Sequence, residues 1–283
     1  VFMSVLPAPF GFGLWTAHFT PAILGAPCVL LDSFTPEATM AAIEAHRVTI
    51  LAAVSTQFVM MLRSTALDRT DLSSLRVLFT GGEMVPFERA VEFEARAGCR
   101  VLQFYGSNET GALSRTTLRD DQDVRLRTAG HVIDAMQVRL LDAETGADVT
   151  STGGPGIAAC RGALNCLGYY ADDDANAELL TPDGWMQTGD LCTLDPAGVL
   201  TVAGRTSDIV IRGGKNISAS QVEDEVGSHP SVALCAAVAM HDAAFGERLC
   251  AAVVLHERPD RGSGNFDLDA LGERSVILDC DVL

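Results

Sequence analysis

An acidic residue and a basic residue, Asp190 and Arg205, stand fifteen positions apart, and each directly follows a glycine. Glycine lets a backbone turn sharply, so Gly189 and Gly204 would present both side chains at turns. A carboxylate accepts hydrogen bonds and a guanidinium donates them, so together the two could hold a polar ligand. A Thr-Gly-Asp sequence taken alone can also be a simple turn, so a binding role for it depends on the other motifs in the chain.

Two further loops with polar residues precede this pair. Each follows an apolar run that is typical of a β-strand, and ligands bind at such strand ends in parallel sheets. The first loop, in "LFTGGE", contains Gly81, Gly82 and Glu83. The second, in "QFYGSNETG", contains Tyr105, Gly106, Ser107, Asn108 and Glu109. Both loops are therefore candidate binding loops.

The elements that must position these loops alternate between strands and helices over residues 1–106. The chain begins inside a predicted strand. A helix is predicted from Thr35, as N-cap, with Pro36 in its first turn. Strands separated by helices of this length indicate a parallel sheet with crossover helices. The predicted strands are 27–32, 49–54, 76–82 and 100–106, and the predicted helices are 35–47, 55–64 and 86–97.

The pattern changes to short β-type runs separated by turns over residues 112–204, and changes again after Gly204. Runs such as "QVRLLD" and "GVLTVAG" predict a β-rich lobe. Strands at 208–214, 232–240 and 248–256 around a helix at 218–229 predict a small α+β unit. The predicted fold class is α/β, a parallel-sheet lobe with crossover helices plus a β-rich lobe, followed by a small, incomplete α+β C-terminal domain. The predicted domains are 1–204 and 205–283.

Composition narrows the class of protein. The chain has 283 residues, 48% hydrophobic and 20% charged, which is globular composition. Its net charge of −17 would repel a polyanion, so we expect no nucleic-acid partner. The 8 cysteines form no C-x-x-C pair, which favours buried thiols in a reducing, cytoplasmic location. No apolar run reaches the roughly 18 residues that a membrane span needs, so we expect no transmembrane segment.

The four loops "TGGE", "YGSNE", "TGD" and "GR" follow one another in order. Together they resemble the adenylate-forming (AMP-binding) superfamily, which includes acyl-CoA synthetases. The stretches "RGALNCLGYYADDDANAELLTPDGWMQTGDL" and "GGKNISASQVEDEVGSHPSV" are also similar to this family, and the likeness covers roughly residues 1–258.

The resemblance implies a function. In the family a carboxylate attacks the α-phosphate of ATP, pyrophosphate leaves, and a thiol, commonly of coenzyme A, captures the acyl-adenylate. It implies that Asp190 and Arg205 bind the ribose, that Tyr105 stacks on adenine, and that Glu109 holds Mg²⁺ against the phosphates. The remaining cofactor-binding candidates are Gly81, Gly82, Glu83, Gly106, Ser107 and Asn108. Tyr105 can alternatively be a core aromatic, and Glu83 a structural residue.

The acyl pocket is predicted to be apolar. Its candidates are Phe10, Phe12, Trp15, Val54, Thr56 and Gly82, which favour a fatty, aromatic or alicyclic small-molecule carboxylate. By resemblance, Gly213, Gly214 and Lys215 could face the coenzyme A side, although Lys215 can equally be a solvated turn residue.

The chain departs from the family in several places. The family's phosphate-binding loop should precede residue 1, and its catalytic lysine is absent, because the one lysine, Lys215, lies in a different place. From about Asp260 the likeness fades. We therefore expect a chain truncated at both ends, whose exposed apolar surface either associates with a complementing chain or a second copy, or lowers its solubility.

Three functions remain open at this point. The first is an ATP-dependent, AMP-forming acyl-CoA synthetase, impaired as an isolated chain. The second passes the acyl-adenylate to a carrier protein instead of coenzyme A. The third is a non-catalytic nucleotide-binding or interaction fragment.

Overall fold

The computed structural model describes residues 1–212, 215–227, 229, 232–242, 246–255 and 275–279. They form two compact units. The first comprises Val1–Thr188 and Cys192–Val202, and the second comprises Gly189–Leu191 with the described residues from Ala203 onward.

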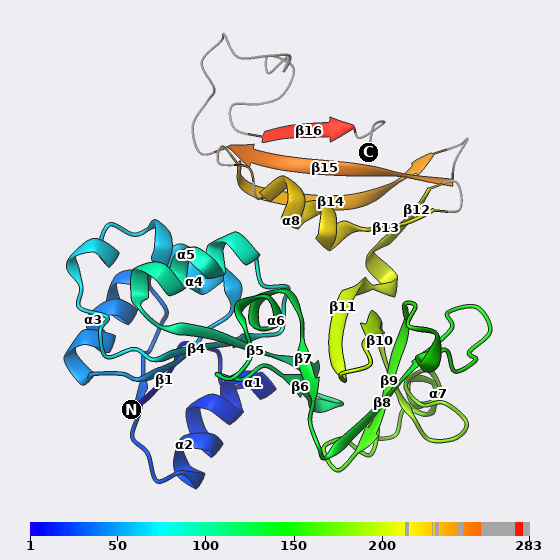
Figure 1. The fold of residues 1–283 in the computed structure, drawn as a ribbon, viewed down its shortest axis with the longest axis horizontal. Helices are drawn as coiled ribbons and strands as arrows, with labels where there is room; N and C mark the ends of the chain where they lie inside the picture. The colour runs from blue at the N-terminus through cyan, green and yellow to red at the C-terminus, as the bar shows by residue number, and fades with distance from the viewer. Residues whose placement is uncertain (213–214, 228, 230–231, 243–245, 256–274, 280–283) are drawn as a thin grey trace. The chain divides into compact units, whose positions relative to one another are not determined.

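The first unit begins with five parallel strands, as the alternation of strands and helices predicts (Figure 1). The strands are β1 (Phe2–Ser4), β2 (Cys28–Leu30), β3 (Ile50–Ala52), β4 (Val77–Gly81) and β5 (Arg100–Ser107). Their spatial order is β2-β1-β3-β4-β5, so the chain moves to one side of β1 and then to the other. Such a reversal is where ligands bind in open α/β sheets.

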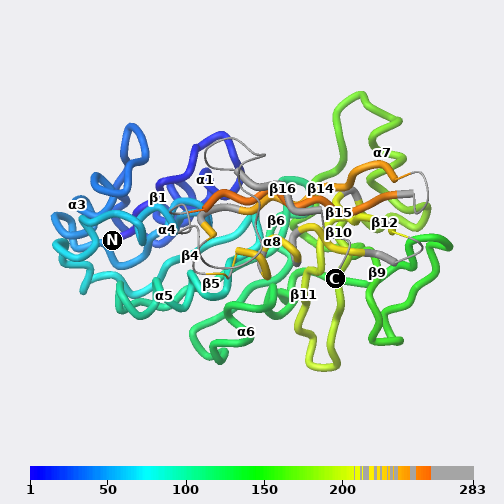
Figure 2. The backbone as a smooth tube through the Cα atoms, turned by 90° about the horizontal axis from the view of Figure 1, so that it is seen from above, coloured from blue at the N-terminus to red at the C-terminus, as the bar shows by residue number. Residues whose placement is uncertain are grey.

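Helices cover both faces of these strands (Figure 1). The main helices are α3 (Pro36–His46), α4 (Ser55–Arg63) and α5 (Phe87–Ala97), and the opposite face carries α1 (Gly11–Leu14), η1 (Trp15–Phe19) and α2 (Thr20–Ile23). Seen from above in Figure 2, α3 and α4 lie beside the N-terminal strand. Fully buried apolar residues of α3, α4, α5 and the strands form one core that includes Met40, Phe58, Leu78, Phe93 and Val101.

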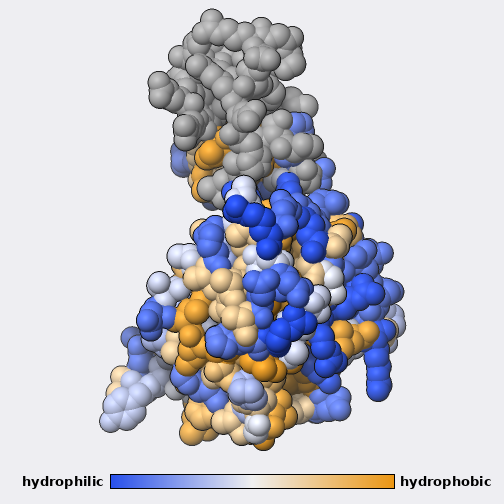
Figure 3. Space-filling model, turned by 90° about the vertical axis from the view of Figure 1, so that its left-hand side faces the viewer, coloured by the Kyte–Doolittle hydropathy of each residue, from blue (hydrophilic) through white to orange (hydrophobic). Residues whose placement is uncertain are grey.

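The helix start predicted at Thr35 is confirmed. Its hydroxyl accepts a hydrogen bond from the backbone N–H of Ala38 at 3.1 Å, and Pro36 occupies the first turn. The helical segment α1–η1–α2 was not predicted, because its apolar residues follow no regular helical period. Large apolar side chains of this segment are exposed: Phe10, Leu14, Trp15, Phe19, Ile23 and Leu24. Figure 3 shows apolar residues among polar ones toward the lower part of the face it presents.

The β-rich lobe predicted for residues 112–204 is part of the same sheet. The eleven-stranded order is β2-β1-β3-β4-β5-β6-β7-β11-β10-β9-β8. The sheet turns antiparallel after β5, since β5 and β6, β6 and β7, and β7 and β11 pair antiparallel. The structure therefore has one large mixed sheet, where the sequence pattern predicted a parallel-sheet lobe with a β-rich lobe on the same core. The added elements are β6 (Gly111–Arg115), α6 (Gln122–Arg127), β7 (Gly130–Val132), β8 (Met136–Leu141), β9 (Gly156–Gly162), α7 (Asp173–Leu179), β10 (Met186–Leu194) and β11 (Val199–Arg205), with single-turn helices Leu67–Arg69 and Thr150–Thr152.

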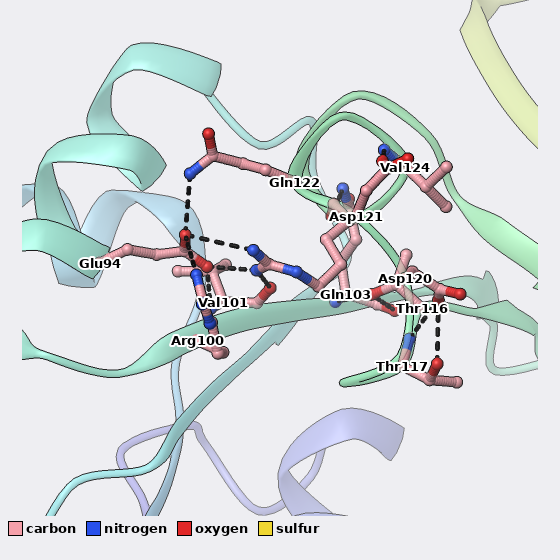
Figure 4. Close-up of polar contacts among 11 residues, drawn as sticks. Glu94, Arg100, Val101, Gln103, Thr116, Thr117, Asp120, Asp121, Gln122 and Val124 are labelled. Atoms are coloured by element: carbon pink, nitrogen blue, oxygen red, sulfur yellow. Dashed lines mark hydrogen bonds and ion pairs between the residues drawn. The ribbon is translucent and has the colours of Figure 1, made fainter.

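A buried ion pair ties α5, β5 and α6 together (Figure 4). Arg125 donates to both carboxylate oxygens of Glu94, and these side chains are only 4% and 6% exposed. The backbone N–H of Val101 donates to Glu94 Oε1 at 2.8 Å, and Gln122 Nε2 donates to Oε2 at 3.0 Å. These hydrogen bonds satisfy both charges and fix the start of β5, the strand that leads to the second candidate loop.

The second unit has a five-stranded antiparallel sheet with one described helix against it. Its elements are the single turn Thr206–Asp208, β12 (Ile209–Arg212), β13 (Lys215–Ser218), α8 (Ala219–Gly227), β14 (Val232–Asp242), β15 (Gly246–Leu255) and β16 (Ser275–Asp279). Val210, Val222, Ala237 and Leu249 form its core. Among the described residues, no helix is long and apolar enough to cross a membrane.

Candidate functional site

The loops that follow the parallel strands β1, β3, β4 and β5 lie at one edge of the sheet, because parallel strands end on the same side. Hydrogen bonds join these loops. Gln57, after β3, donates from Nε2 to the carbonyl of Val5, after β1, at 2.8 Å. The backbone N–H of Gly11 donates to Asn108 Oδ1, after β5, at 3.1 Å. Residues from three separate stretches of sequence thus meet at one edge.

The loop after β4 contacts the first turn of α4. Glu83 Oε1 accepts a hydrogen bond from the backbone N–H of Thr56 at 2.9 Å. N–H groups in the first turn of a helix have no helical acceptor, so a carboxylate there is favourable. Val54 precedes this turn, and its N–H donates to the side chain of Gln57 at 3.1 Å. Glu83 therefore has a structural partner, as its alternative interpretation expected, while Thr56 and Glu83 are brought together.

Three aromatic rings form a compact group on the same face of β4 and β5. The Phe12 ring centroid lies 4.7 Å from that of Phe104 and 5.7 Å from that of Phe79, both edge to face. Phe79 and Phe104 stack with centroids 5.2 Å apart. Of the aromatic pocket candidates, Phe12 thus joins an apolar surface, whereas Phe10 is 62% exposed and Trp15 packs on Phe19.

Two glycines stand at the end of β4, Gly81 as its last residue and Gly82 after it, and each position requires glycine for a different structural reason. A Cβ on Gly81 would stand 2.4 Å from the Phe104 ring, so aromatic packing alone excludes a side chain there. Gly82 has φ of 86°, in the left-handed region, and a Cβ there would meet nothing within 4 Å. Gly82 therefore leaves open space beside the loop, and Gly81 leaves the room that the Phe104 ring needs.

Tyr105 is half-buried near the end of β5. It packs against two groups of buried residues, one including Leu140 and Leu200 and the other including Leu113 and Met186. The register between β5 and β6 shifts between Tyr105 and Gly106, which marks a bulge where the strand ends. This packing holds the tyrosine in place and agrees with its interpretation as a core aromatic; it leaves the adenine role a prediction.

The loop Ser107–Thr110 is closed by hydrogen bonds within itself. The N–H of Ser107 donates to Thr110 Oγ1 at 2.9 Å, and the N–H groups of Glu109 and Thr110 donate to Ser107 Oγ at 3.1 and 3.2 Å. The loop thus presents Asn108 and Glu109 from a fixed backbone.

Glu109 is the metal candidate, and its surroundings bear on that role. No group of three His, Cys, Asp or Glu side chains converges among the described residues. Mg²⁺ bound with a nucleotide commonly takes only one or two carboxylates, the remainder being phosphate oxygens and water. A lone carboxylate such as Glu109 therefore fits Mg²⁺ that phosphates also hold, and does not fit an all-protein metal cage.

A residue that the sequence reasoning missed contacts Glu109. The hydroxyl of Tyr169 donates to Glu109 Oε1 at 3.1 Å, and the N–H of Cys166 donates to the Glu109 carbonyl at 2.7 Å. The hydrogen bond to a carboxylate raises the pKa of Tyr169, because loss of its proton would place two negative charges side by side. The likeness of "LGYYADDDANAE" to the family was the one signal that pointed to this segment.

In the second unit, Asp190 and Arg205 pair as their types suggest. Arg205 Nε lies 3.3 Å from Asp190 Oδ1; the arginine side chain is 67% exposed and the aspartate side chain 11%. Gly189 has φ of 74°, so the chain turns sharply before Asp190 in the middle of β10. The hydroxyl of Thr206 donates to the Gly189 carbonyl at 3.0 Å. The two residues are close enough to share one small polar ligand.

The predicted coenzyme A side is described only in part. Gly213 and Gly214 lie outside the described residues. The backbone of Lys215 begins β13, which pairs antiparallel with β12, and its side chain also lies outside the described part.

Comparisons with known proteins identify relatives. The family model described as "AMP-binding enzyme" matches residues 1–170. A medium-chain fatty-acid–CoA ligase of Escherichia coli is 36% identical over 260 residues, which cover 90% of this chain and 44% of the ligase. An indoleacetate–CoA ligase of Aromatoleum aromaticum is 36% identical over 253 residues, covering 89% of this chain and 49% of that enzyme. The chain spans about half the length of the curated relatives it matches.

A solved structure, ATP-bound MatB from Rhodopseudomonas palustris, superposes with a TM-score of 0.82 at 26% identity. The match covers 93% of this chain and 51% of that one. The resemblance carried by the four loops is therefore confirmed: this chain belongs to the AMP-binding, adenylate-forming enzyme family and is similar to its acyl-CoA ligases.

Proposed function

We propose that this chain is part of an ATP-dependent, AMP-forming acid–thiol ligase for a hydrophobic carboxylic acid. In the first half-reaction a carboxylate oxygen of the substrate attacks the α-phosphorus of ATP, and the bond to the pyrophosphate oxygen breaks. In the second, a thiol sulfur attacks the acyl carbon, and AMP leaves. The observation that carries the proposal is the meeting of the β1, β3, β4 and β5 loops at one sheet edge, in a chain of this family.

The proposed nucleotide-binding residues are those that the family's loops imply. Asp190 would accept hydrogen bonds from the ribose hydroxyls, and Arg205 would donate to ribose oxygens. Their 3.3 Å separation supports this, because a ligand with hydroxyl groups can bond to both. Tyr105 would stack on adenine, and Gly82, with open space beside it, would allow the base to approach. Gly106, Ser107 and Asn108 would complete the loop under the nucleotide.

Negative charge develops on the phosphates as the substrate attacks, and cations stabilise it. Mg²⁺, when bound, supplies positive charge there, and Glu109 would hold it. The 283 residues contain one lysine, Lys215, which lies away from the position that the family's catalytic lysine takes. We therefore propose that these residues alone bind nucleotide and form adenylate slowly, since one well-placed donor contributes about 10²- to 10³-fold to rate.

The acyl group would face the apolar side of the loops. Phe12, Phe79 and Phe104 form a ring surface. The Phe79 carbonyl accepts a hydrogen bond from the N–H of Ala53 at 3.1 Å, and Val54 and Thr56 follow at the N-terminus of α4. Apolar surface of this kind favours fatty, aromatic or alicyclic acids over acids that carry a second charge. Coenzyme A is the proposed acceptor, with residues 213–215 on its side; the alternative is a carrier-protein thiol, and product analysis separates the two.

Calorimetric titration of the purified chain with AMP tests the ribose site. We expect binding in the micromolar range, weakened by about 10- to 100-fold in Asp190→Ala, because the carboxylate would make charge-assisted hydrogen bonds. Asp173→Asn is the matched control, since Asp173 is an exposed aspartate of α7. Equal AMP affinity in wild type and Asp190→Ala would refute the assignment of Asp190. Absence of AMP binding by the folded chain would favour a non-catalytic interaction fragment.

A further inference from the structure

One segment reaches Glu109 from sixty positions away in the sequence. Tyr169 donates its hydroxyl to Glu109 Oε1 at 3.1 Å, and the neighbouring Cys166 N–H donates to the backbone carbonyl of Glu109 at 2.7 Å. The segment between β9 and α7 therefore holds both the backbone and the carboxylate of the metal candidate. Both partners belong to the first compact unit.

The backbone of Tyr169 is itself held. Asn176 of α7 accepts a hydrogen bond from the Tyr169 N–H at 2.7 Å and donates from Nδ2 to the Tyr169 carbonyl at 2.8 Å. Gly168 has φ of 125°, and a Cβ there would stand 2.6 Å from Asn176 Oδ1. Asp172 caps α7 by accepting from the N–H of Ala175 at 3.0 Å. The capped helix α7 fixes Asn176, and Asn176 fixes the backbone of Tyr169. These hydrogen bonds therefore direct the Tyr169 hydroxyl toward Glu109.

We propose that Tyr169 is a positioning residue for Glu109: it orients the carboxylate that binds Mg²⁺ with ATP, and Asn176 supports it. This inference rests on the proposed function. A carboxylate has about four acceptor positions, so the hydrogen bond from Tyr169 to Oε1 is compatible with metal binding by the same carboxylate. Partners behind a metal-binding side chain commonly fix its orientation and raise affinity.

A purely structural role for Tyr169 makes a different prediction. If the hydroxyl only stabilised the loop, its removal would weaken the binding of Mg·ATP and of AMP by the same factor. If it orients Glu109 for the metal, its removal acts on Mg·ATP and leaves AMP binding unchanged, and has no effect once the Glu109 carboxylate is gone. Coupling between two residues in this sense is what a double-mutant cycle measures.

The experiment is calorimetric titration of the purified chain with Mg·ATP and, separately, with AMP. The variants are Tyr169→Phe, Asn176→Ala, Glu109→Gln and the double variant of Tyr169→Phe with Glu109→Gln. Tyr170→Phe is the matched control, because Tyr170 is the adjacent tyrosine and is 99% exposed. Far-ultraviolet circular dichroism checks that each variant is folded.

We expect Tyr169→Phe to weaken Mg·ATP binding by about 3- to 10-fold, the size of one hydrogen bond, with AMP affinity unchanged. Asn176→Ala should shift Mg·ATP affinity in the same direction, and Tyr170→Phe should match wild type. In the Glu109→Gln background, Tyr169→Phe should add nothing. Unchanged Mg·ATP affinity in Tyr169→Phe alongside a loss in Glu109→Gln would overturn this inference and leave the proposed function standing. Wild-type protein that binds neither AMP nor Mg·ATP would overturn both.

Discussion

Replacing Glu94 by glutamine would leave the guanidinium of Arg125 buried without its counter-charge. Glutamine has nearly the same shape, and its Oε1 can still accept the hydrogen bond that Val101 N–H donates at 2.8 Å. The change therefore removes the charge and replaces Oε2, which accepts from Gln122 and Arg125, by an NH₂ group that can only donate. The two side chains are 6% and 4% exposed, so solvent screens their interaction only weakly.

Breaking a buried ion pair by removing one partner costs about 3–5 kcal/mol, because the remaining charge is left in a poorly solvated place. Because glutamine keeps an acceptor for Val101, we expect the lower end, about 3 kcal/mol. With a slope of about 3 kcal/mol per M, the urea midpoint of the first unit would fall by about 1 M. Both tryptophans, Trp15 and Trp185, belong to the first unit, so tryptophan fluorescence reports its unfolding.

The pH dependence provides a second measurement. Glu94 has a pKa below its usual 4.5; burial opposes this, and the hydrogen bonds from Arg125, Val101 and Gln122 outweigh the burial. A carboxylate with a lowered folded-state pKa contributes stability above its unfolded pKa and loses it as pH falls through the folded value. The gap in unfolding free energy between wild type and Glu94→Gln should therefore be constant from pH 7 to about 5 and narrow below about pH 4.5.

Glu88→Gln is the matched control, since Glu88 is an exposed glutamate of the same helix. We expect that variant to stay within about 0.5 kcal/mol of wild type. A loss below 1 kcal/mol in Glu94→Gln, or a loss equal to that of Glu88→Gln, would refute the argument that the buried pair fixes α5, β5 and α6 to one another.

Two further changes have effects that follow from single contacts. Gly81→Ala would place a methyl group 2.4 Å from the Phe104 ring, so we expect the free energy of unfolding in urea to fall by about 1–3 kcal/mol. Gly154→Ala is the control, because its methyl group would meet only an ordinary contact at 3.4 Å. Equal losses in the two variants would show that the rings move aside freely. Thr35→Ala removes the cap of α3 and should cost about 1 kcal/mol in the same measurement, while Thr35→Ser retains the hydroxyl and should cost less.

The sequence predicted those parts of the fold that local patterns determine. Thr35 and Pro36 start α3 as predicted because capping and first-turn chemistry act over three or four residues. The four parallel strands predicted at 27–32, 49–54, 76–82 and 100–106 are present for a similar reason. Short apolar runs between helices are buried most readily as strands of a parallel sheet. The helical stretch Gly11–Ile23 was missed because its exposed apolar residues break the helical period.

The joining of the β-rich stretch to the parallel strands could not be read from local patterns. Nothing in the short run Gly130–Val132 or in "GVLTVAG" says that β7 will pair with β11, about seventy residues later, and so continue the first sheet. Strand pairing over such a distance is decided by the whole packing arrangement, whereas strand formation is decided locally.

The same distinction between local and long-range contacts applies to the candidate site. Gly82, Glu83, Tyr105 and Glu109 could be proposed as candidates because each lies where a predicted strand ends, and the topology of a parallel sheet brings such ends together. Tyr169 could not be proposed from the sequence. Its positioning role is inferred from one hydrogen bond to Glu109, sixty positions away, and from the two hydrogen bonds with Asn176 that orient it. Motif spacing therefore indicates which side chains would meet a ligand, whereas the residues that orient those side chains emerge only from the folded contacts.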